Sequence, residues 1–400
     1  MHSAQKVPLV AIACGGTGGH LFPGLAVAEV LARTGCSISL MVSSKDVDQQ
    51  AVRSTPGLQV VRLPAVGLVS GQISAFVRGF WQSYRAVKQT FRAQPPQAVL
   101  AMGGFTSAAP ILAGRGVGAA TFLHESNSIP GRANRWLAPF VDAAFIGFPS
   151  AARRLHCHTV KTTGTPVRPQ FQARDAAACR AALGLETDRP VLLVMGGSQG
   201  ASGVNQLVAQ SLPQFSAHLP DLQILHLTGQ NDLGKISDAY AAYKLKAVVR
   251  PFLAEMELAL GAATAAVSRS GASSLAELAA MRVPAVLIPY PSAVDNHQFY
   301  NAWAFVESGA ARMLEQEKAR PETLVEMVKG LIEKPDLREG MKQALAKWSR
   351  SDAAAQIAAQ MLEAMTRNGV HCPALAGAHA ASPPQPVAAA KVKMQTTNAG

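Results

Sequence analysis

A glycine-rich loop near the start of the chain carries the residues most able to do chemistry. Residues 14–24 read CGGTGGHLFPG, follow the apolar run 7–13 and precede a segment with helical spacing at 25–32. Strand, glycine loop and helix in this order direct backbone N–H groups toward an anion, and glycine lets the backbone approach a phosphate closely. The loop is neither a P-loop nor a clean dinucleotide fingerprint. It predicts a phosphate or pyrophosphate site, with a tight strand-to-helix turn as the alternative.

The same arrangement occurs twice more. Gly103 and Gly104 follow the apolar run 98–100, and a glycine loop at 196–202 follows the run 190–194. Three such loops, the third about half a chain length away, predict two nucleotide-binding units and a site that handles several phosphates.

Polar side chains follow other predicted strands. His124 and Glu125 can form an acid–base pair, or can hydrogen-bond neighbouring loops instead. Arg168 can clamp a phosphate or a carbonyl group. The small residues 271–274 can host a ligand at a helix N-terminus. Glu277 lies in the first turns of that helix. Its carboxylate either interacts favourably with the helix dipole or accepts hydrogen bonds from two vicinal hydroxyls.

Strands and helices that could position these residues alternate along the chain. Predicted strands lie at 7–13, 37–42, 59–63, 98–101, 119–123, 143–146, 159–163, 191–195, 223–227, 247–249, 265–267, 283–289 and 311–314. This alternation is typical of an α/β fold with parallel sheets, in which ligands bind at the carboxyl ends of the strands. The predicted segments are an N-terminal domain at 1–168, a linker at 169–188, a C-terminal domain at 189–350, a helix at 351–368 that returns to the N-terminal domain, and a disordered tail at 369–400.

The composition narrows the class of partner. A net charge of +12 and a pI near 9.7 favour nucleic acid, an anionic membrane surface or phosphorylated substrates. The five cysteines show neither a CxxC pair nor zinc spacing, which is typical of reduced thiols in a cytosolic protein. The sequence has no secretory signal and no run of 18 apolar residues. We therefore expect neither secretion nor a membrane span.

The segment 68–92 differs from the rest because it interleaves aromatic and basic side chains and contains no acid. These side chains are Phe76, Arg78, Phe80, Trp81, Tyr84, Arg85, Lys88 and Arg92. A basic amphipathic segment of this kind can lie on an anionic bilayer. The alternative is a core helix whose basic residues form its solvated face.

Six motifs occur in order between about residues 7 and 365. They are GGTGGH with FPG at 15–24, GGF at 103–105, HESN at 124–127, GGSQGA at 196–201, SRSGA at 268–272 with Glu277, and DNHQ at 295–298 with Asn301. Together they closely resemble the MurG family of bacterial peptidoglycan glycosyltransferases. Ser126 departs from the family pattern, which frequently has Gln at that position, and the tail after 368 has no counterpart.

This resemblance implies a GT-B fold, in which two Rossmann-like domains with parallel sheets face each other across a cleft. It implies transfer of GlcNAc from UDP-GlcNAc to the C4 hydroxyl of MurNAc in undecaprenyl-pyrophosphoryl-MurNAc-pentapeptide (lipid I). The product is lipid II, formed with inversion during peptidoglycan synthesis. The implied location is the cytoplasmic face of the bacterial inner membrane, as a peripheral protein, with cell-wall synthesis proteins as candidate partners.

The resemblance also implies which residues form the site. Contacts to the UDP-GlcNAc donor are expected from Thr17, Gly18, Gly19, Asn127, Arg168, Ser198, Leu253, Ala272, Ser273, Ser274, Glu277, His297 and Gln298. Contacts to the acceptor pyrophosphate are expected from Gly15, Gly16, Gly103 and Gly104. Whether His297 or Gln298 faces the sugar stays open.

An inverting transfer needs a base that takes the proton of the acceptor hydroxyl. His20 is the first candidate because a neutral imidazole titrates in the right range, and Glu125 and His124 are alternatives. Arg168 and the helix N-terminus after Gly200 would stabilise the negative charge on the leaving group. No DxD-like acidic pair ends a predicted strand, so we predict no essential metal or other cofactor.

Two other classes of function remain as alternatives. A UDP-GlcNAc 2-epimerase or another GT-B lipid glycosyltransferase would use the same loops, but an epimerase gains nothing from the basic aromatic segment. A nucleic-acid module would explain the charge, but no RNA- or DNA-binding motif is present, so we expect no nucleic-acid partner.

Overall fold

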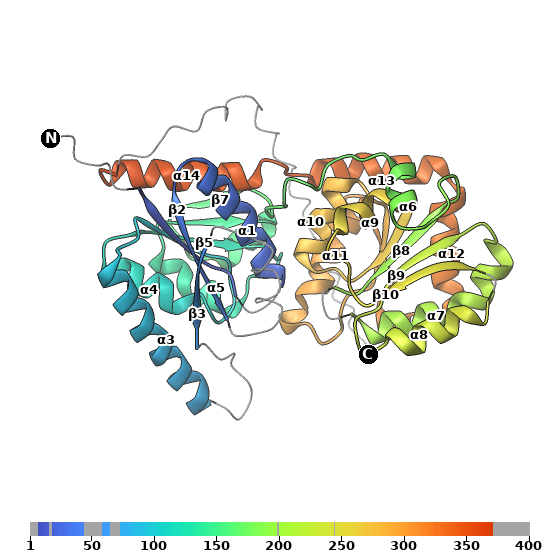
Figure 1. Ribbon diagram of the computed structural model, residues 1–400, viewed down its shortest axis with the longest axis horizontal. Helices are drawn as coiled ribbons and strands as arrows, with labels where there is room; N and C mark the ends of the chain where they lie inside the picture. Colours follow the sequence, from blue (N-terminus) through green and yellow to red (C-terminus); the bar gives the residue numbers. More distant parts are fainter. Residues whose placement is uncertain are drawn as a thin grey trace, which may run out of the picture.

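Two parallel β-sheets organise the chain. The computed structural model describes residues 7–15, 18–43, 58–64, 73–197, 200–243 and 245–370. A seven-stranded and a six-stranded sheet lie side by side, each covered by helices (Figure 1). The predicted disordered tail falls outside the described residues from 371 onward.

The first unit contains the seven-stranded sheet and the helices that cover it. Its elements are β1 (Leu9–Ala13), α1 (Gly18–Arg33), β2 (Ser37–Ser43), β3 (Gln59–Leu63), α3 (Ile73–Ala93), β4 (Ala98–Ala101), α4 (Ala108–Gly116), β5 (Ala120–Glu125), α5 (Arg132–Leu137), η1 (Ala138–Phe140), β6 (Ala143–Ile146), η2 (Pro149–Arg154) and β7 (Val160–Thr162).

The second unit contains the six-stranded sheet, and its last helix leads back to the first unit. Its elements are α6 (Ala176–Ala182), β8 (Val191–Met195), α7 (Ser202–His218), β9 (Gln223–Leu227), α8 (Leu233–Ala241), β10 (Lys246–Arg250), α9 (Met256–Ala262), β11 (Ala265–Ser268), α10 (Ala272–Met281), β12 (Ala285–Leu287), η3 (Val294–Asn296), α11 (His297–Glu307), β13 (Arg312–Met313), η4 (Gln316–Lys318), α12 (Pro321–Glu333), α13 (Pro335–Trp348) and α14 (Ala353–Arg367).

Alternate residues of the central strands bury into two different layers. In β1, Val10 and Ile12 pack into a cluster with α1 and α14, whereas Ala11 and Ala13 pack into a cluster with α3 and α4. The strand order of the first sheet is β3-β2-β1-β4-β5-β6-β7, and that of the second is β10-β9-β8-β11-β12-β13. Strands buried on both faces need apolar residues throughout, which explains their near-continuous apolar runs. The predicted α/β class with two parallel sheets is confirmed.

Two segments connect the units. The chain crosses from α13 to α14, which lies beside α1 in Figure 1 and buries Ile357 and Met361 in the core of the first unit. The sequence predicts a plain linker at 169–188, but these residues contain α6, and Phe171 and Cys179 are buried in the core of the second unit. The buried side chains of this segment, which include Leu183 and Leu185 as well, therefore belong to the core of the second unit.

Candidate active site between the two units

The N-termini of two helices meet where the units touch. The hydroxyl of Ser273, in the first turn of α10, donates a hydrogen bond of 3.1 Å to the carbonyl oxygen of Gly19, in the first turn of α1. An α-helical carbonyl normally accepts from the N–H four residues later, but that residue is Pro23, which has no N–H. Gly19 can therefore offer its carbonyl oxygen to the other unit. Two positive helix ends converge here, as an anion site requires.

His20 lies at this junction, with its ring over two glycines. A Cβ atom on Gly103 would lie 2.8 Å from His20 Cε1, and one on Gly104 would lie 3.3 Å from His20 Cδ2. Both glycines also have positive φ angles, of +110° and +77°. Only glycine satisfies the backbone angle and the close approach together. The structure thus gives Gly103 and Gly104 a reason for being glycine that the sequence analysis did not contain.

The other acceptor-side glycines are only partly described. A Cβ atom on Gly15 would lie 2.3 Å from the backbone nitrogen of Ser43, so this glycine lets the loop cross the end of β2. Its carbonyl oxygen accepts a hydrogen bond of 3.0 Å from the Thr106 hydroxyl. Gly16 and Thr17 lie outside the described residues. Gly18, the first residue of α1, is buried.

His124 is fully engaged within the first unit. Its Nε2 lies 3.0 Å from the carbonyl oxygen of Gly164, and its Nδ1 lies 3.2 Å from the hydroxyl of Ser126. The side chain is completely buried, and this burial lowers the pKa of His124 to about 4. A neutral ring donates from Nε2 to the carbonyl and accepts from the hydroxyl at Nδ1. Neither nitrogen is left to take a proton from a substrate.

Glu125 is equally committed. Its Oε1 accepts from the backbone N–H and the side-chain amide of Asn127, at 2.8 and 3.1 Å. Its Oε2 accepts from the backbone N–H of Gly131 and from the Asn134 amide, both at 2.9 Å. Four donors on one buried carboxylate hold the loop between β5 and α5 in place. Among the three predicted base candidates, His20 alone is not fully buried.

Glu277 and Arg168 approach each other from opposite units. Burial raises the pKa of Glu277 to about 7, against the nearby Arg168 guanidinium, which lowers it. Arg168 lies over the rings of Phe22 and Phe171, at 4.9 and 5.1 Å from their centroids. Its Nε is buried and has no hydrogen-bond partner among the described residues. A partly buried carboxyl with a raised pKa and a buried N–H with no acceptor among the described residues both fit a site that binds hydroxyls and phosphate oxygens.

The loop before α11 is held by a second set of contacts. Gln298 Oε1 accepts from the backbone N–H of Tyr290 at 3.0 Å, and the carbonyl oxygen of Gln298 accepts from the Ser270 hydroxyl at 2.8 Å. His297 Nδ1 donates to the carbonyl oxygen of Val294 at 2.8 Å, so a neutral His297 presents Nε2 as an acceptor. Asp295 has a φ angle of +51°, which is unusual for a residue with a side chain.

Asn301 joins the two units, and sequence analysis gave it no role in the site. Its Nδ2 donates to Asn127 Oδ1 at 3.0 Å, and its Oδ1 accepts from the backbone N–H of Ser128 at 2.8 Å. The side chain is completely buried. The sequence signals for it are its place four residues after His297, on the same face of α11, and its occurrence with the DNHQ motif.

The third glycine loop precedes α7. A Cβ atom on Gly200 would lie 2.2 Å from the carbonyl oxygen of Thr228, and its φ angle is +77°, so glycine is required there. Ser198 lies outside the described residues. Leu253, the predicted uracil neighbour, follows β10 and is buried, and Ala272 and Ser274 lie in the first turn of α10.

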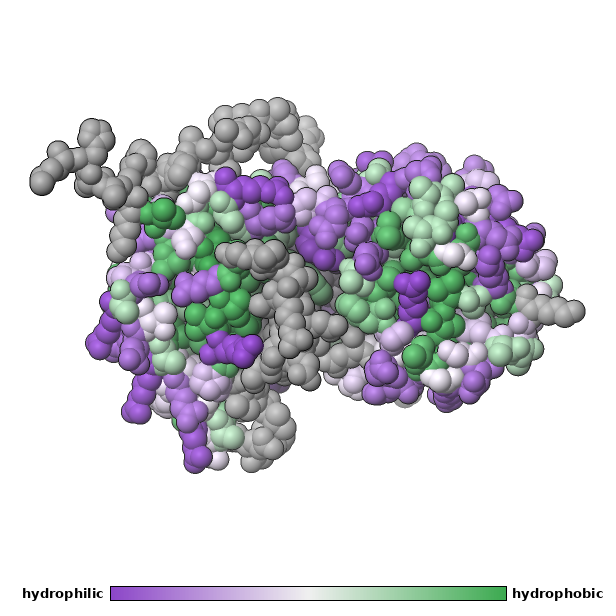
Figure 2. Space-filling model, viewed as in Figure 1, coloured by the Kyte–Doolittle hydropathy of each residue, from purple (hydrophilic) through white to green (hydrophobic). Residues whose placement is uncertain are grey.

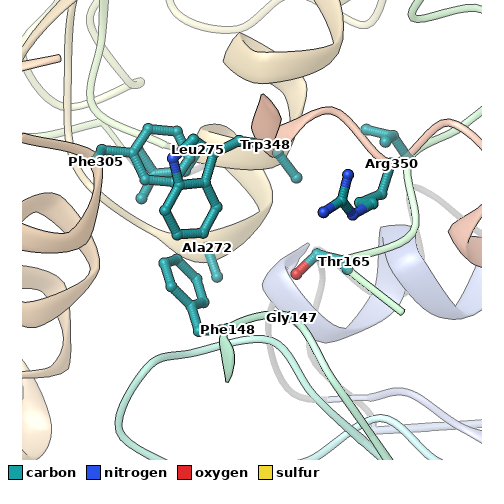
Figure 3. A pocket seen from close by; sticks show the side chains of 11 residues that line it. Gly147, Phe148, Thr165, Ala272, Leu275, Phe305, Trp348 and Arg350 are labelled. Atoms are coloured by element: carbon teal, nitrogen blue, oxygen red, sulfur yellow. The ribbon is translucent and has the colours of Figure 1, made fainter. Parts of the chain in front are cut away.

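A small pocket lies beside this junction, between the units. Figure 3 shows the rings of Phe148, Phe305 and Trp348 on one side and the side chains of Thr165 and Arg350 on the other. Trp348 stacks on Phe305 with ring centroids 4.5 Å apart and lies 5.2 Å from Phe148 of the first unit. Among the described residues, no group of three or more His, Cys, Asp or Glu could hold a metal ion.

The predicted membrane residues lie on α3, at the lower left of Figure 1. The helix buries Ser83, Val87 and Phe91, while Trp81 is 53% exposed. Arg78 and Arg85 are exposed, Phe76 and Phe80 are partly buried, and Lys88 lies over the Tyr84 ring. Figure 2 shows hydrophilic side chains along this edge. In the described part of the chain, no helix is long and apolar enough to span a membrane.

The matching family models and the relatives in sequence agree on one family. Residues 10–146 match the N-terminal domain of glycosyltransferase family 28, and residues 191–357 match its C-terminal domain. Two relatives named UDP-N-acetylglucosamine–N-acetylmuramyl-(pentapeptide) pyrophosphoryl-undecaprenol N-acetylglucosamine transferase are similar over most of the chain. The protein from Sorangium cellulosum is 36% identical over 88% of both chains. That from Acidithiobacillus ferrooxidans is 37% identical over 88% of this chain and 97% of its own.

Solved structures share the fold. The crystal structure of Acinetobacter baumannii MurG superposes with a TM-score of 0.70 at 24% identity, over 90% of this chain and all of that one. A putative UDP-N-acetylglucosamine 2-epimerase from Listeria monocytogenes reaches 0.69 at 14% identity, over 90% of this chain and 98% of its own. The backbone alone therefore does not separate a transferase from an epimerase.

Proposed function

The chain belongs to glycosyltransferase family 28, and we propose that it transfers GlcNAc from UDP-GlcNAc to the MurNAc C4 hydroxyl of undecaprenyl-pyrophosphoryl-MurNAc-pentapeptide. One observation carries this proposal: relatives named for this transfer are 33–37% identical over nearly the whole chain. The convergence of two helix N-termini at Gly19 and Ser273 supports it, because donor and acceptor each carry a diphosphate.

The donor is bound mainly by the second unit. The Glu277 carboxylate accepts hydrogen bonds from the ribose hydroxyls. The first turn of α10, with Ala272, Ser273 and Ser274, lines the diphosphate. The glycine loop with Ser198 completes the diphosphate site, and Leu253 faces the uracil. Gly18, Gly19, Asn127 and Arg168 close the site from the first unit. The buried Nε of Arg168 supports this arrangement, because a phosphate oxygen would satisfy it.

The reaction is a single displacement at the anomeric carbon. His20 takes the proton of the acceptor hydroxyl, the oxygen attacks C1, and the C1–O bond to the β-phosphate breaks with its electron pair on UDP. Its place in the first turn of α1 favours a neutral imidazole, because the positive helix end disfavours a second positive charge. His297 or Gln298 orients the sugar, and no metal ion is needed.

The acceptor is a lipid, so the enzyme must reach a membrane. We propose that α3 rests on the anionic cytoplasmic face of the inner membrane, with Phe76, Phe80 and Trp81 at the interface and Arg78, Arg85 and Lys88 near lipid phosphates. The exposed Trp81 and the absence of acidic residues from α3 support this orientation. Other cell-wall synthesis proteins remain candidate partners.

One assay separates this function from its nearest rival. The protein is incubated with UDP-GlcNAc, with and without a short-chain lipid I analogue, in the presence of EDTA. Formation of a GlcNAc-extended analogue and UDP only when the acceptor is present supports the proposal. Formation of UDP-ManNAc without acceptor contradicts it and favours an epimerase.

A further inference from the structure

Arg269 is a buried cation whose side-chain hydrogen bonds, in the described part of the chain, all go to neutral groups. It follows β11 directly, and only 7% of its surface is exposed. One terminal nitrogen donates to the carbonyl oxygens of Ile288 and Pro289, at 3.1 and 3.0 Å. The other terminal nitrogen donates to Gln316 Oε1 at 2.6 Å. No carboxylate of the described residues pairs with it, and its guanidinium carbon lies 5.4 Å from the centre of the Tyr290 ring.

Such an arrangement is costly for a residue that only ties loops together. Burying a charge with neutral partners leaves part of its lost hydration uncompensated. Burial lowers the pKa of Arg269 to about 10, so the guanidinium still carries its charge at neutral pH. Arg269 is therefore a fixed positive charge that no carboxylate of the described residues neutralises through an ion pair.

The position of this charge points to its purpose. Gln316, which accepts from Arg269, packs against Gly203 in the first turn of α7: a Cβ atom on Gly203 would lie 2.4 Å from Gln316 Oε1. Arg269 also lies two residues before Gly271, the N-cap of α10. The side chain of Gln316 thus separates the guanidinium from the first turn of α7, and Arg269 itself lies two residues before the N-cap of α10. The N-termini of these two helices would hold the donor diphosphate.

We propose that Arg269 provides an electrostatic counter-charge for the diphosphate of the donor, acting from behind the binding surface without touching the ligand. The inference rests on the proposed function, because it assumes that the second unit binds a nucleoside diphosphate. When the C1–O bond breaks, UDP gains one negative charge, and a fixed positive charge nearby favours that state. Arg269 thus acts on the ligand only through its charge and is not a catalytic residue.

A purely structural role makes a different prediction. Through Ile288 and Pro289, Arg269 also anchors the chain that leads to Gln298. If that were its whole purpose, its loss would weaken every ligand of the second unit to the same degree. A charge effect instead grows with the charge of the ligand.

The test is calorimetric titration with uridine, UMP and UDP, and its readout is the ratio of the uridine dissociation constant to that of UDP. A general loosening, or a fraction of unfolded protein, cancels in this ratio. The proteins are the unmodified chain, Arg269→Met, Arg269→Gln and Arg269→Lys. Gln316→Glu is added because it places a carboxylate beside the intact guanidinium and neutralises it where it lies.

For Arg269→Met and Arg269→Gln we expect the ratio to fall by about tenfold or more, with UMP between the two other ligands. Arg269→Lys should stay within about threefold of the unmodified chain, because it keeps the charge. Gln316→Glu should lower the ratio although it strengthens the tie between the two side chains.

Two results would overturn the inference: an unchanged ratio in Gln316→Glu, or a loss in Arg269→Lys as large as in Arg269→Met. If the unmodified chain does not bind UDP at all, the proposed function itself is contradicted, and the inference with it.

Discussion

The hydroxyl of Ser273 is bonded to the carbonyl oxygen of Gly19, and this bond links α10 of the second unit to α1 of the first. It depends on Pro23, which removes the helical donor that Gly19 would otherwise have. A proline inside a helix normally weakens it. Here the same proline frees an acceptor at the point where two diphosphates are expected to meet the protein.

Loss of this bond should loosen the contact between the units. Ser273→Ala removes the donor, and Pro23→Ala restores an N–H that competes for the same oxygen. A hydrogen bond of this kind contributes about 1 kcal/mol, so any arrangement in which the two units have moved apart should gain roughly fivefold in population. Single-molecule energy transfer between dyes at the exposed positions Gln89 and Glu326 measures it. Ser274→Ala is the matched control, and an unchanged distribution in both variants would disprove the role of the bond.

Glu277 should make stability depend on pH. Its folded-state pKa of about 7 lies above the usual value for a glutamate, so the neutral form suits the ligand-free fold. Its burial therefore costs nothing below the unfolded pKa and destabilises the fold progressively as the pH rises through about 7. Glu277→Gln should be more stable than the unmodified chain at pH 8, on the order of 1–3 kcal/mol, but not at pH 4. Urea unfolding at both pH values measures this, and an equal difference at both would contradict it.

The same substitution should weaken the binding of the donor. A glutamine can accept from only one of its two terminal atoms, so the ribose hydroxyls lose an acceptor. We expect Glu277→Gln, and more strongly Glu277→Ala, to raise the donor KM by about tenfold or more with a smaller effect on kcat. An unchanged donor KM in Glu277→Ala would remove the ribose contact from the account.

Gly103→Ala should displace the proposed base without removing it. The new methyl group would meet the His20 ring at 2.8 Å, so the ring must move. We expect kcat to fall at least tenfold, approaching the loss in His20→Ala, while the donor KM changes little. Gly118→Ala is the matched control, because Gly118 also has a positive φ angle but no atom within 4 Å of its Cβ position. Equal effects at both glycines would mean that backbone strain, and not His20, is responsible.

Removal of the aromatic side chains of α3 should detach the protein from membranes. Replacing Phe80 and Trp81 by Ser should lower co-sedimentation with vesicles that contain anionic lipid several-fold, since each aromatic ring contributes apolar burial at the interface. Turnover of a short-chain soluble acceptor should be unchanged. Trp303→Ser, which removes a 45% exposed tryptophan from the other unit, is the control. Equal sedimentation of all three proteins would count against α3 as the membrane face.

The strands could be predicted to within about two residues at each end, because most are short runs rich in apolar side chains. The runs 59–63, 98–101 and 223–227 are strands with these same bounds in the structure. Helix α6 was missed because it buries mainly Cys179 and is otherwise alanine and polar residues, which resemble a linker. Periodicity detects a helix only when its buried face is wide enough to leave a pattern.

The site was less accessible to sequence analysis than the fold. A motif shows that His124 and Glu125 follow a strand, but not that Gly164, Ser126, Asn127, Gly131 and Asn134 already occupy their hydrogen-bonding atoms. The contact of Asn301 with Asn127 joins residues 174 positions apart. Such partners are set by the packing of one unit on the other, which no local pattern encodes.

Transfer of the sugar itself tests the central claim most directly. The protein is given UDP-GlcNAc labelled with carbon-13 in the sugar and a short-chain lipid I analogue, and the product is examined by NMR. The account predicts one new β-linked GlcNAc on the C4 oxygen of MurNAc, formed together with one UDP per sugar transferred. An α-linked product, transfer to another hydroxyl, or UDP release without transfer would contradict it.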